Sequence, residues 1–258
     1  MTVEPRLYLN TDLSAGAELA LGKEESHYLL TVMRRKAGDG VRVFNGRDGE
    51  WRAEVADAGK RAARLSVQTR LREQRESPDV HLYFSPVKRA RTDFIVEKAT
   101  ELGAARIAPV MTRRTMAETV RLDRLAAHAR EAAEQTERLD LPQIGEPCTL
   151  AALIDGWAKD RPLLFCDEAG DEGGKPWGGE AGRARPILEA LQRFERGTPF
   201  AILIGPEGGF DPAERDILRD QDFVVPVTLG PRILRADTAA AAALTVYQAV
   251  LGDWNTSL

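Results

Sequence analysis

The chain has 258 residues, of which 43% are hydrophobic, and a net charge of −4, so it can bury the core of one large domain or of two smaller ones. The opening MTVEPRLYLN has no apolar signal core, and no segment reaches the roughly 18 consecutive apolar residues of a membrane span. The two cysteines, Cys148 and Cys166, are too few and too far apart for a disulfide framework or a zinc site. We therefore expect a soluble, cytoplasmic protein without a membrane segment or a metal.

Charge is distributed unevenly along the chain. Residues 1–145 carry 25 basic and 22 acidic side chains, whereas residues 146–258 carry 11 basic and 18 acidic ones. A basic excess this small does not by itself indicate a nucleic-acid partner, because charged runs are usually solvated surfaces. The basic clusters of the first 145 residues are therefore only candidates for phosphate contacts.

Residues 1–72 have the pattern of a small β-barrel. Apolar and polar residues alternate on both sides of a turn that contains Asn45-Gly46, which is typical of a β-hairpin. The polar run at 70–79 is the predicted linker, because it has little to bury. Further strands are predicted at residues 6–9, 18–21 and 63–67, and a helix at residues 26–34.

Strands and helices alternate after the linker, which predicts an α/β domain over residues 73–258 with a mainly parallel sheet. Asp211, Pro212 and Glu214 form a capping box that predicts the start of a helix. Residues 167–186 are rich in glycine and acidic side chains, and we expect a long loop there. The predicted strands are 80–85, 105–111, 162–166, 200–204 and 223–228, and the other predicted helices are 89–102, 122–137, 187–194 and 237–251.

The stretch LIGPEGGF, residues 203–210, places a glycine-rich turn directly after a buried strand. Its spacing fits neither a Walker phosphate loop nor a dinucleotide-binding loop. Open α/β sheets bind ligands at the carboxyl ends of their strands, and glycine lets a ligand approach the backbone closely. The alternative is an ordinary tight turn.

A second patterned turn, LGPRILRADTA at residues 229–239, follows the next strand and leads into an alanine-rich helix. Two glycine turns at the ends of neighbouring strands predict a pocket. The small residues Ala239 to Ala243 permit close approach of another backbone or of a partner subunit, unless they reflect only high helix propensity.

These segments together resemble the RsmE family of SPOUT methyltransferases. The resemblance extends over most of the chain, through PRLYL, HYLLTVMRRKAGDGVRVFNG, VKRARTDFIVEKATELGAARIAPV, EAAEQTERLDLPQI and the two glycine turns. It implies a PUA-like β-barrel RNA-binding domain over residues 1–72 and a SPOUT methyltransferase domain with a C-terminal trefoil knot over residues 73–258. It also implies a homodimer that uses S-adenosylmethionine to methylate N3 of a uridine in the 16S ribosomal RNA of an assembled or nearly assembled small ribosomal subunit.

The resemblance also implies the residues of the site. Arg235 is the candidate donor to the developing uracil anion, and an ion pair across a dimer is the alternative. Asp237 stands where the family usually has glutamate, and it either takes part in catalysis or caps the final helix. Glu207 either holds a loop or faces the substrate. The cofactor-binding candidates, on three loops of the knot, are Phe165, Asp167, Ile204, Gly205, Pro206, Glu207, Gly208, Leu229, Gly230, Ile233, Leu234, Thr238 and Ala239.

Candidate RNA contacts come from both domains. Each basic residue alone is better explained as a solvated surface residue, but together they could supply the salt-dependent part of RNA affinity. Two other functions stay open, a non-catalytic RNA-binding or ribosome-assembly factor and a SPOUT enzyme that methylates another RNA position. The RNA-binding candidates are Arg6, His27, Arg34, Arg35, Lys88, Arg89 and Arg91.

Overall fold

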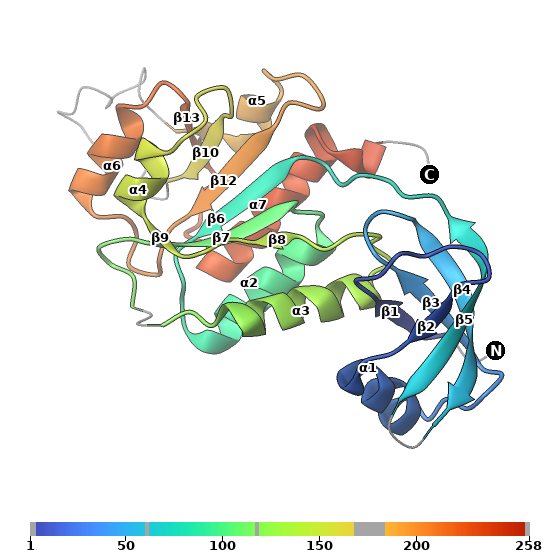
Figure 1. The fold of residues 1–258 in the computed structure, drawn as a ribbon. Helices are drawn as coiled ribbons and strands as arrows, with labels where there is room; N and C mark the ends of the chain where they lie inside the picture. The colour runs from blue at the N-terminus through green and yellow to red at the C-terminus, as the bar shows by residue number, and fades with distance from the viewer. Residues whose placement is uncertain (1–3, 60–61, 117–118, 168–183, 256–258) are drawn as a thin grey trace. The chain divides into compact units, whose positions relative to one another are not determined.

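The computed structural model describes residues 4–59, 62–116, 119–167 and 184–255 (Figure 1). The chain divides into two compact units. The first runs to Glu76 and also takes in Ala133–Leu141, and the second comprises Ser77–Ala132 and Pro142–Leu258. The sequence pattern predicted a single boundary after residue 72, and no local pattern indicates that residues 133–141 join the first unit.

The first unit is built on a five-stranded sheet of β1 (Arg6–Tyr8), β2 (Glu18–Ala20), β3 (Gly40–Phe44), β4 (Glu50–Ala58) and β5 (Ala63–Arg72). The strand order is β1-β3-β4-β5-β2, with β1 and β3 parallel and the other neighbours antiparallel. Alternate side chains, among them Val41, Val43 and Leu65, are buried in one apolar core. This alternation is the pattern from which the strands were predicted.

The predicted hairpin is confirmed, because β3 and β4 pair antiparallel on either side of the Asn45 turn. The side-chain oxygen of Asn45 accepts hydrogen bonds from the backbone N–H groups of Arg47 at 2.9 Å and Asp48 at 2.8 Å. Gly46 has a φ of 79° and Gly49 a φ of 81°, a left-handed conformation that costs glycine no Cβ clash. One asparagine and two glycines therefore specify the turn.

The helical segment of the first unit differs from the predicted helix at 26–34. Helix α1 covers Lys23–His27 and continues as a π-helical turn over Tyr28–Val32. The backbone N–H of Met33 donates to the carbonyl of Tyr28, five residues earlier, at 2.9 Å. A periodicity of 3.6 residues cannot reveal such a widened turn.

The second unit contains an eight-stranded sheet of β6 (Val80–Phe84), β7 (Arg106–Met111), β8 (Gln143–Ile144), β9 (Cys148–Thr149), β10 (Leu163–Cys166), β11 (Arg185–Pro186), β12 (Phe200–Ile204) and β13 (Val224–Thr228). Its order is β11-β13-β10-β12-β6-β7-β8, with β9 paired to β7, and the pairings among the described residues are parallel. The α/β class with a mainly parallel sheet is confirmed. The sequence did not predict β8, β9 and β11, because each of these strands is only two residues long and so shows no periodicity. Residues 168–183 of the predicted loop lie outside the described residues.

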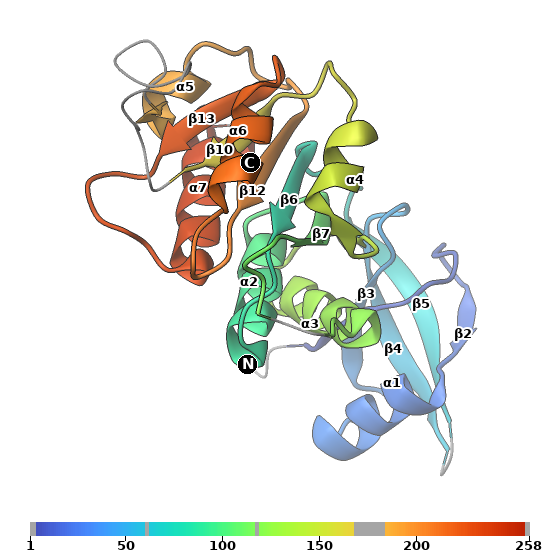
Figure 2. The same ribbon diagram turned by 90° about the vertical axis from the view of Figure 1, so that its left-hand side faces the viewer.

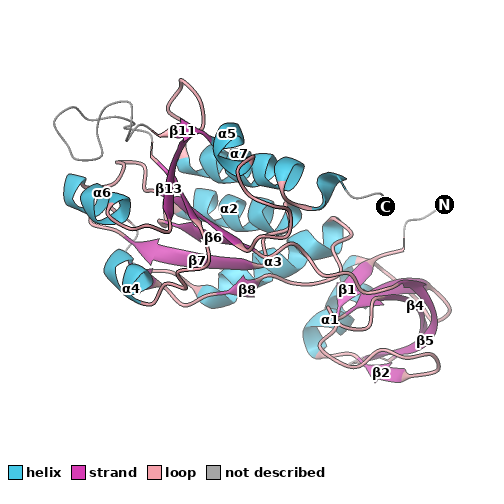
Figure 3. Cartoon of the chain, turned by 90° about the horizontal axis from the view of Figure 1, so that it is seen from above, coloured by secondary structure: helices cyan, strands magenta, loops and turns pink. Residues whose placement is uncertain are grey.

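Helices cover both faces of this sheet (Figures 2 and 3). Helices α2 (Arg89–Glu101), α3 (Leu122–Gln135), α5 (Ile187–Leu191) and α7 (Ala236–Val250) contribute to the core on one face. Helices α4 (Leu150–Asp155) and α6 (Pro212–Arg219) contribute to the core on the other face. Because both faces are covered, the central strands are continuous apolar runs rather than alternating ones. No described helix is long and apolar enough to cross a membrane.

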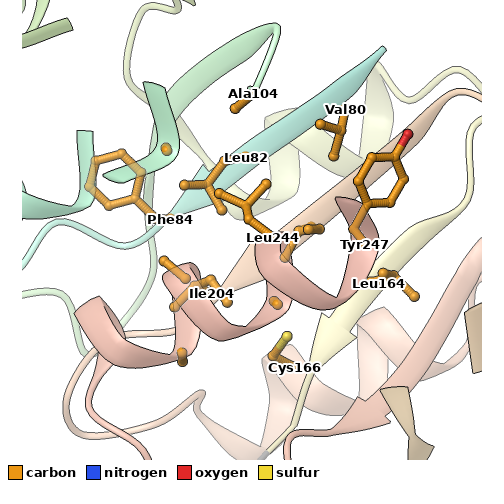
Figure 4. Packing of buried hydrophobic residues seen from close by; sticks show 14 of the residues in the cluster. Val80, Leu82, Phe84, Ala104, Leu164, Cys166, Ile204, Leu244 and Tyr247 are labelled. Atoms are coloured by element: carbon orange, nitrogen blue, oxygen red, sulfur yellow. The ribbon is translucent and has the colours of Figure 1, made fainter. Parts of the chain in front are cut away.

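Helix α7 packs closely on the sheet because its inward face is made of small residues. Ala239, Ala240 and Ala243 are buried, and Leu244 belongs to the same apolar cluster as Leu82 and Ile204 of the neighbouring strands β6 and β12 (Figure 4). Each large apolar side chain buried in this way contributes about 1.5–3 kcal/mol. These alanines therefore pack in the core of their own unit. The sequence had left open whether they contact another backbone of the same chain or a partner subunit.

The predicted start of α6 is confirmed as a capping box. The Asp211 carboxylate accepts a hydrogen bond from the N–H of Ala213 at 3.1 Å, and the Glu214 carboxylate accepts one from the N–H of Asp211 at 3.1 Å. Pro212 occupies the first helical position, where no hydrogen bond from its nitrogen is needed. This cap fixes where the loop after β12 ends.

Candidate functional site

A pocket of about 470 Å³ opens at the carboxyl edge of the second unit's sheet. Strand β10 lies between β13 and β12 in the sheet, so the segments that follow these three parallel strands meet at one edge. The start of α2, which follows β6, adds one side chain. The lining residues are Arg91, Cys166, Asp167, Ile204, Gly205, Pro206, Glu207, Val227, Thr228, Leu229, Gly230, Pro231, Arg232, Ile233, Leu234, Arg235, Ala236 and Ala239.

The structure brings most of the predicted cofactor-binding residues to this pocket. Four of the predicted cofactor-binding and catalytic residues are not among the lining residues. Phe165 is fully buried in the core, the carbonyl of Gly208 accepts a hydrogen bond from Arg114 at 2.9 Å, and Asp237 and Thr238 lie in the first turn of α7. The predicted cofactor-binding and catalytic residues that do line the pocket are Asp167, Ile204, Gly205, Pro206, Glu207, Leu229, Gly230, Ile233, Leu234, Arg235 and Ala239.

Gly205 is required by the protein's own packing. A Cβ on Gly205 would lie 2.5 Å from the ring of Phe210. That ring is buried edge-on against Phe165, with the ring centroids 5.0 Å apart, so it cannot easily move. The glycines of this turn were predicted to leave room for a ligand, but the ring of Phe210 occupies the space beside Gly205.

Gly230 has a different reason to be glycine. Its φ of 110° lies in the region that L-residues with a side chain rarely adopt, and nothing lies within 4 Å of the position of a Cβ. Thr228 supports this turn, because its hydroxyl donates to the Gly230 carbonyl at 3.2 Å and accepts from the Gly230 N–H at 3.3 Å. Backbone conformation therefore selects glycine here, and it leaves the peptide groups uncovered at the pocket.

Asp167 ties the loop after β10 to helix α6. Its side chain is 1% exposed and accepts hydrogen bonds from Arg215 at 3.1 Å and from Arg219 at 2.7 Å. A buried carboxylate needs such charged partners, because an unpaired one costs several kcal/mol. The sequence named Asp167 and missed both arginines, since their spacing on α6 is indistinguishable from that of a charged surface.

Arg235 is exposed at the rim of the pocket and is the N-cap residue of α7. Among the described residues its guanidinium has no hydrogen-bond or ion-pair partner, so its donors are available to a ligand. Two residues later, Oδ1 of Asp237 accepts a hydrogen bond from the N–H of Thr238 at 2.8 Å. This bond lies in the first turn of α7, where the interaction of a carboxylate with the helix dipole is favourable.

Arg91 lies at the pocket, where it contacts two carboxylates. Its guanidinium donates to Glu207, and its Nε lies 3.9 Å from Oδ2 of Asp237. Arg91 was predicted from the sequence to contact RNA. No signal in the sequence indicates that residues 116 and 146 positions away are its partners.

Arg6 was expected to contact RNA phosphates, and the structure contradicts this. Its side chain is buried and donates to Glu50 at 2.5 Å and to the carbonyls of Ala133 at 2.7 Å and Arg138 at 2.9 Å, all within the first unit. Its guanidinium carbon also lies 4.4 Å from the ring centroid of Phe44. A guanidinium whose donors are used inside the core cannot contact phosphate.

The remaining RNA candidates have positions that are compatible with a surface role. His27, Arg34, Lys88 and Arg89 are exposed, and Arg35 is partly buried. Arg34 has a φ of 53°, an uncommon conformation for a residue with a side chain.

Among the described residues no group of three or more histidine, cysteine, aspartate or glutamate side chains could hold a metal ion.

Comparison with known proteins identifies two domains. A family model described as an RNA methyltransferase domain matches residues 75–248, and one described as an RNA methyltransferase PUA domain matches residues 21–68. The first match covers more than half of the chain and contains all the residues that line the pocket.

Relatives match over nearly the whole chain. The ribosomal RNA small subunit methyltransferase E of Rickettsia conorii is 30% identical over 240 residues, 93% of each protein, and that of Synechocystis is 33% identical over 251 residues, 95% of this chain and 78% of the relative. The crystal structure of the enzyme of the same name from Neisseria gonorrhoeae, bound to S-adenosyl methionine, has a TM-score of 0.80 at 25% identity and covers 98% of this chain and 100% of that chain. The chain therefore belongs to the ribosomal RNA small subunit methyltransferase E family, as its sequence motifs indicated.

Proposed function

We propose that the chain transfers the methyl group of S-adenosylmethionine to N3 of a specific uridine in 16S ribosomal RNA. The proposed substrate is the assembled or nearly assembled small ribosomal subunit, and the proposed location is the cytoplasm. Membership of the family supports methylation of small-subunit ribosomal RNA, and the Neisseria relative supports the cofactor. The observation that carries the proposal is the pocket built from the segments after β10, β12 and β13.

The pocket fits a cofactor of this kind in size and chemistry. Its volume of about 470 Å³ lies within the range of small-molecule sites, which are mostly apolar with a few placed polar groups. Ile204, Leu229 and Leu234 supply apolar surface, and Gly205 and Gly230 supply peptide groups without side chains. We propose these residues, with the other predicted residues that line the pocket, as the cofactor site, and we propose that the three loops form a trefoil knot.

Arg235 is the proposed electrostatic catalyst. S-adenosylmethionine, when bound, would supply an electrophilic methyl group and leave as S-adenosylhomocysteine, and uridine N3 must lose its proton to accept the methyl group. A guanidinium stays protonated and cannot act as the base, but it can donate hydrogen bonds to the negative charge that develops on uracil. The exposed position of Arg235 at the pocket and the absence of a side-chain partner among the described residues support this role.

We propose that Asp237 holds Arg235 in position and does not act as the base. Its carboxylate accepts the N–H of Thr238 and faces Arg91, so both oxygens already have a neighbour. Fixing the first turn of α7 fixes Arg235, which is the N-cap of the same helix. Thr238 is included in the proposed site because its N–H donates the hydrogen bond that holds Asp237 in this turn.

The RNA is proposed to contact the exposed basic residues of both units. His27, Arg34, Arg35, Lys88 and Arg89 are the candidates that keep this assignment. Each phosphate contact releases counterions, so RNA affinity should fall steeply as salt is raised. Replacement of a true phosphate contact by alanine reduces the slope of that dependence by about one.

A homodimer is also part of the proposal. The inward face of α7 is covered by its own unit, so a partner would meet the partly buried residues on the other face, such as Ala241, Ala242 and Thr245. Light scattering on the purified chain should give twice the monomer mass of 28.4 kDa. A monomeric mass at micromolar concentration would remove the dimer from the proposal.

Methyl transfer in vitro tests the proposed function. Purified chain is incubated with unmodified small ribosomal subunits and methyl-labelled S-adenosylmethionine, and the nucleosides are separated by mass spectrometry. We expect label in 3-methyluridine. Label in another nucleoside would identify a different SPOUT activity, and RNA binding without cofactor binding or label would identify a non-catalytic assembly factor.

A further inference from the structure

Arg91 is the one candidate for RNA contact that lies in the pocket lining. It is the third residue of α2, and its guanidinium donates to the carboxylate of Glu207 and lies 3.9 Å from that of Asp237. All three side chains are partly enclosed, with exposures of 30% for Arg91, 39% for Glu207 and 19% for Asp237. The cation therefore lies between two carboxylates at the rim of the pocket.

These contacts join three separate segments of the second unit. Arg91 lies in the first turn of α2, Glu207 lies in the loop after β12, and Asp237 lies in the first turn of α7. Asp237 is held on its other side as well, because its Oδ1 accepts the N–H of Thr238. One guanidinium thus links the two glycine turns that form the pocket to a helix that is not part of either turn.

These ion pairs are too weak to matter much for folding, so we consider their effect on the positions of the pocket segments. Partly exposed ion pairs contribute only about 0.2–1 kcal/mol to folding. Removing the cation, however, leaves two carboxylates near each other at the pocket, where like charges repel. The loop after β12 and the start of α7 would then move apart, and the peptide groups of Gly205 and Gly230 would no longer face a common ligand.

We infer that Arg91 is a positioning residue of the cofactor pocket, which holds Glu207 and Asp237, and that it does not contact RNA phosphate. This inference rests on the proposed function, because the ligand it concerns is S-adenosylmethionine. The guanidinium donates a hydrogen bond to Glu207 and lies within ion-pair distance of Asp237, so two carboxylates already balance its charge and compete with a phosphate for it. Arg89, two residues earlier on the same helix and exposed, provides the matched comparison.

Calorimetry with S-adenosylmethionine and salt-dependent binding to small ribosomal subunits form the test. Arg91→Ala should bind S-adenosylmethionine about tenfold more weakly than the wild type and keep the wild-type salt slope for the subunit. Arg89→Ala should show the reverse, with unchanged cofactor affinity and a salt slope lower by about one. Arg91→Lys, which keeps the charge but loses the planar fork, should lie between wild type and Arg91→Ala.

A double variant separates positioning from a general loss of structure. If Arg91 acts through Glu207, then Arg91→Ala should weaken cofactor binding less in a Glu207→Gln background than in the wild type. Equal losses in both backgrounds, or wild-type cofactor affinity in Arg91→Ala, would overturn the inference. A wild type that binds no S-adenosylmethionine would overturn the proposed function itself, and this outcome is distinct from both.

Discussion

Arginines in the core of the first unit and at the pocket of the second differ in what surrounds them. Arg6 is enclosed and donates to Glu50 and to backbone carbonyls, whereas Arg235 is exposed and has no side-chain partner among the described residues. A buried guanidinium requires a partner for its charge because desolvation is costly, while an exposed one can exchange water for a ligand. Surroundings, and not residue type, therefore separate a structural arginine from one that is available for chemistry.

Arg6→Ala should give the largest change, a loss of about 3–5 kcal/mol in the unfolding free energy. Glu50, which is 1% exposed, would lose its 2.5 Å partner and keep only Arg72 at 2.9 Å and Arg42 at 3.8 Å. Although burial raises it, the hydrogen bonds from Arg72 and Arg6 hold the pKa of Glu50 below its usual value. Denaturation followed by circular dichroism measures the loss.

Arg47→Ala is the matched control for Arg6. Arg47 pairs with Asp12 at 3.0 Å, but both side chains are more than half exposed, so its removal should cost at most about 1 kcal/mol. If Arg6→Ala were as stable as Arg47→Ala and bound ribosomal subunits more weakly, the original assignment of Arg6 to RNA would be correct.

Arg235→Ala should lower turnover by about a hundredfold or more without weakening the binding of S-adenosylmethionine. The reason is that the proposed hydrogen bonds to uracil form mainly as negative charge develops. Single-turnover methyl transfer and calorimetry measure the two effects. Arg232→Ala, which removes another exposed arginine of the same pocket, is the control, and equal losses in the two variants would indicate a general electrostatic effect.

Gly205→Ala should lower the unfolding free energy by about 1–3 kcal/mol, because the new methyl group meets the buried ring of Phe210. Gly208→Ala is the control on the same turn. Its Cβ would lie 3.8 Å from the nearest atom, a side-chain carbon of Arg114, which is an ordinary contact. Equal stability of the two variants would show that Phe210 can move, and that ligand clearance is the better explanation for Gly205.

His81 provides the smallest expected effect and a third kind of surroundings for a basic group. Burial, the largest cause, lowers the pKa of His81 from 6.5 to about 4. As the pH falls below 6.5 the unfolded chain binds a proton that the folded chain does not, so stability should decrease between pH 6.5 and pH 5 by up to about 1 kcal/mol after allowance for partial exposure. His81→Asn should reduce this pH dependence of the unfolding free energy. An unchanged pH profile in the variant would show that the lowered pKa of His81 is not its cause.

Local features of the fold follow from the sequence, and long-range ones do not. The capping box of α6 and the turn at Asn45 depend on residues within three positions of one another, and both are confirmed. The enclosure of Arg6 depends on carbonyls more than 120 residues away, and no pattern records such a contact. The same limit applies to the pocket, where the loops were predicted but the contacts of Asp167 with α6 and of Arg91 with Glu207 were not.

Nucleoside analysis of ribosomal RNA from cells tests the central claim most directly. The gene is deleted, and the strain is complemented with the wild-type chain or with Arg235→Ala. We predict that 3-methyluridine disappears from one position of the 16S ribosomal RNA on deletion and returns to full occupancy with the wild type, while the variant restores it slowly or not at all. Persistence of 3-methyluridine in the deletion strain would contradict the proposed substrate.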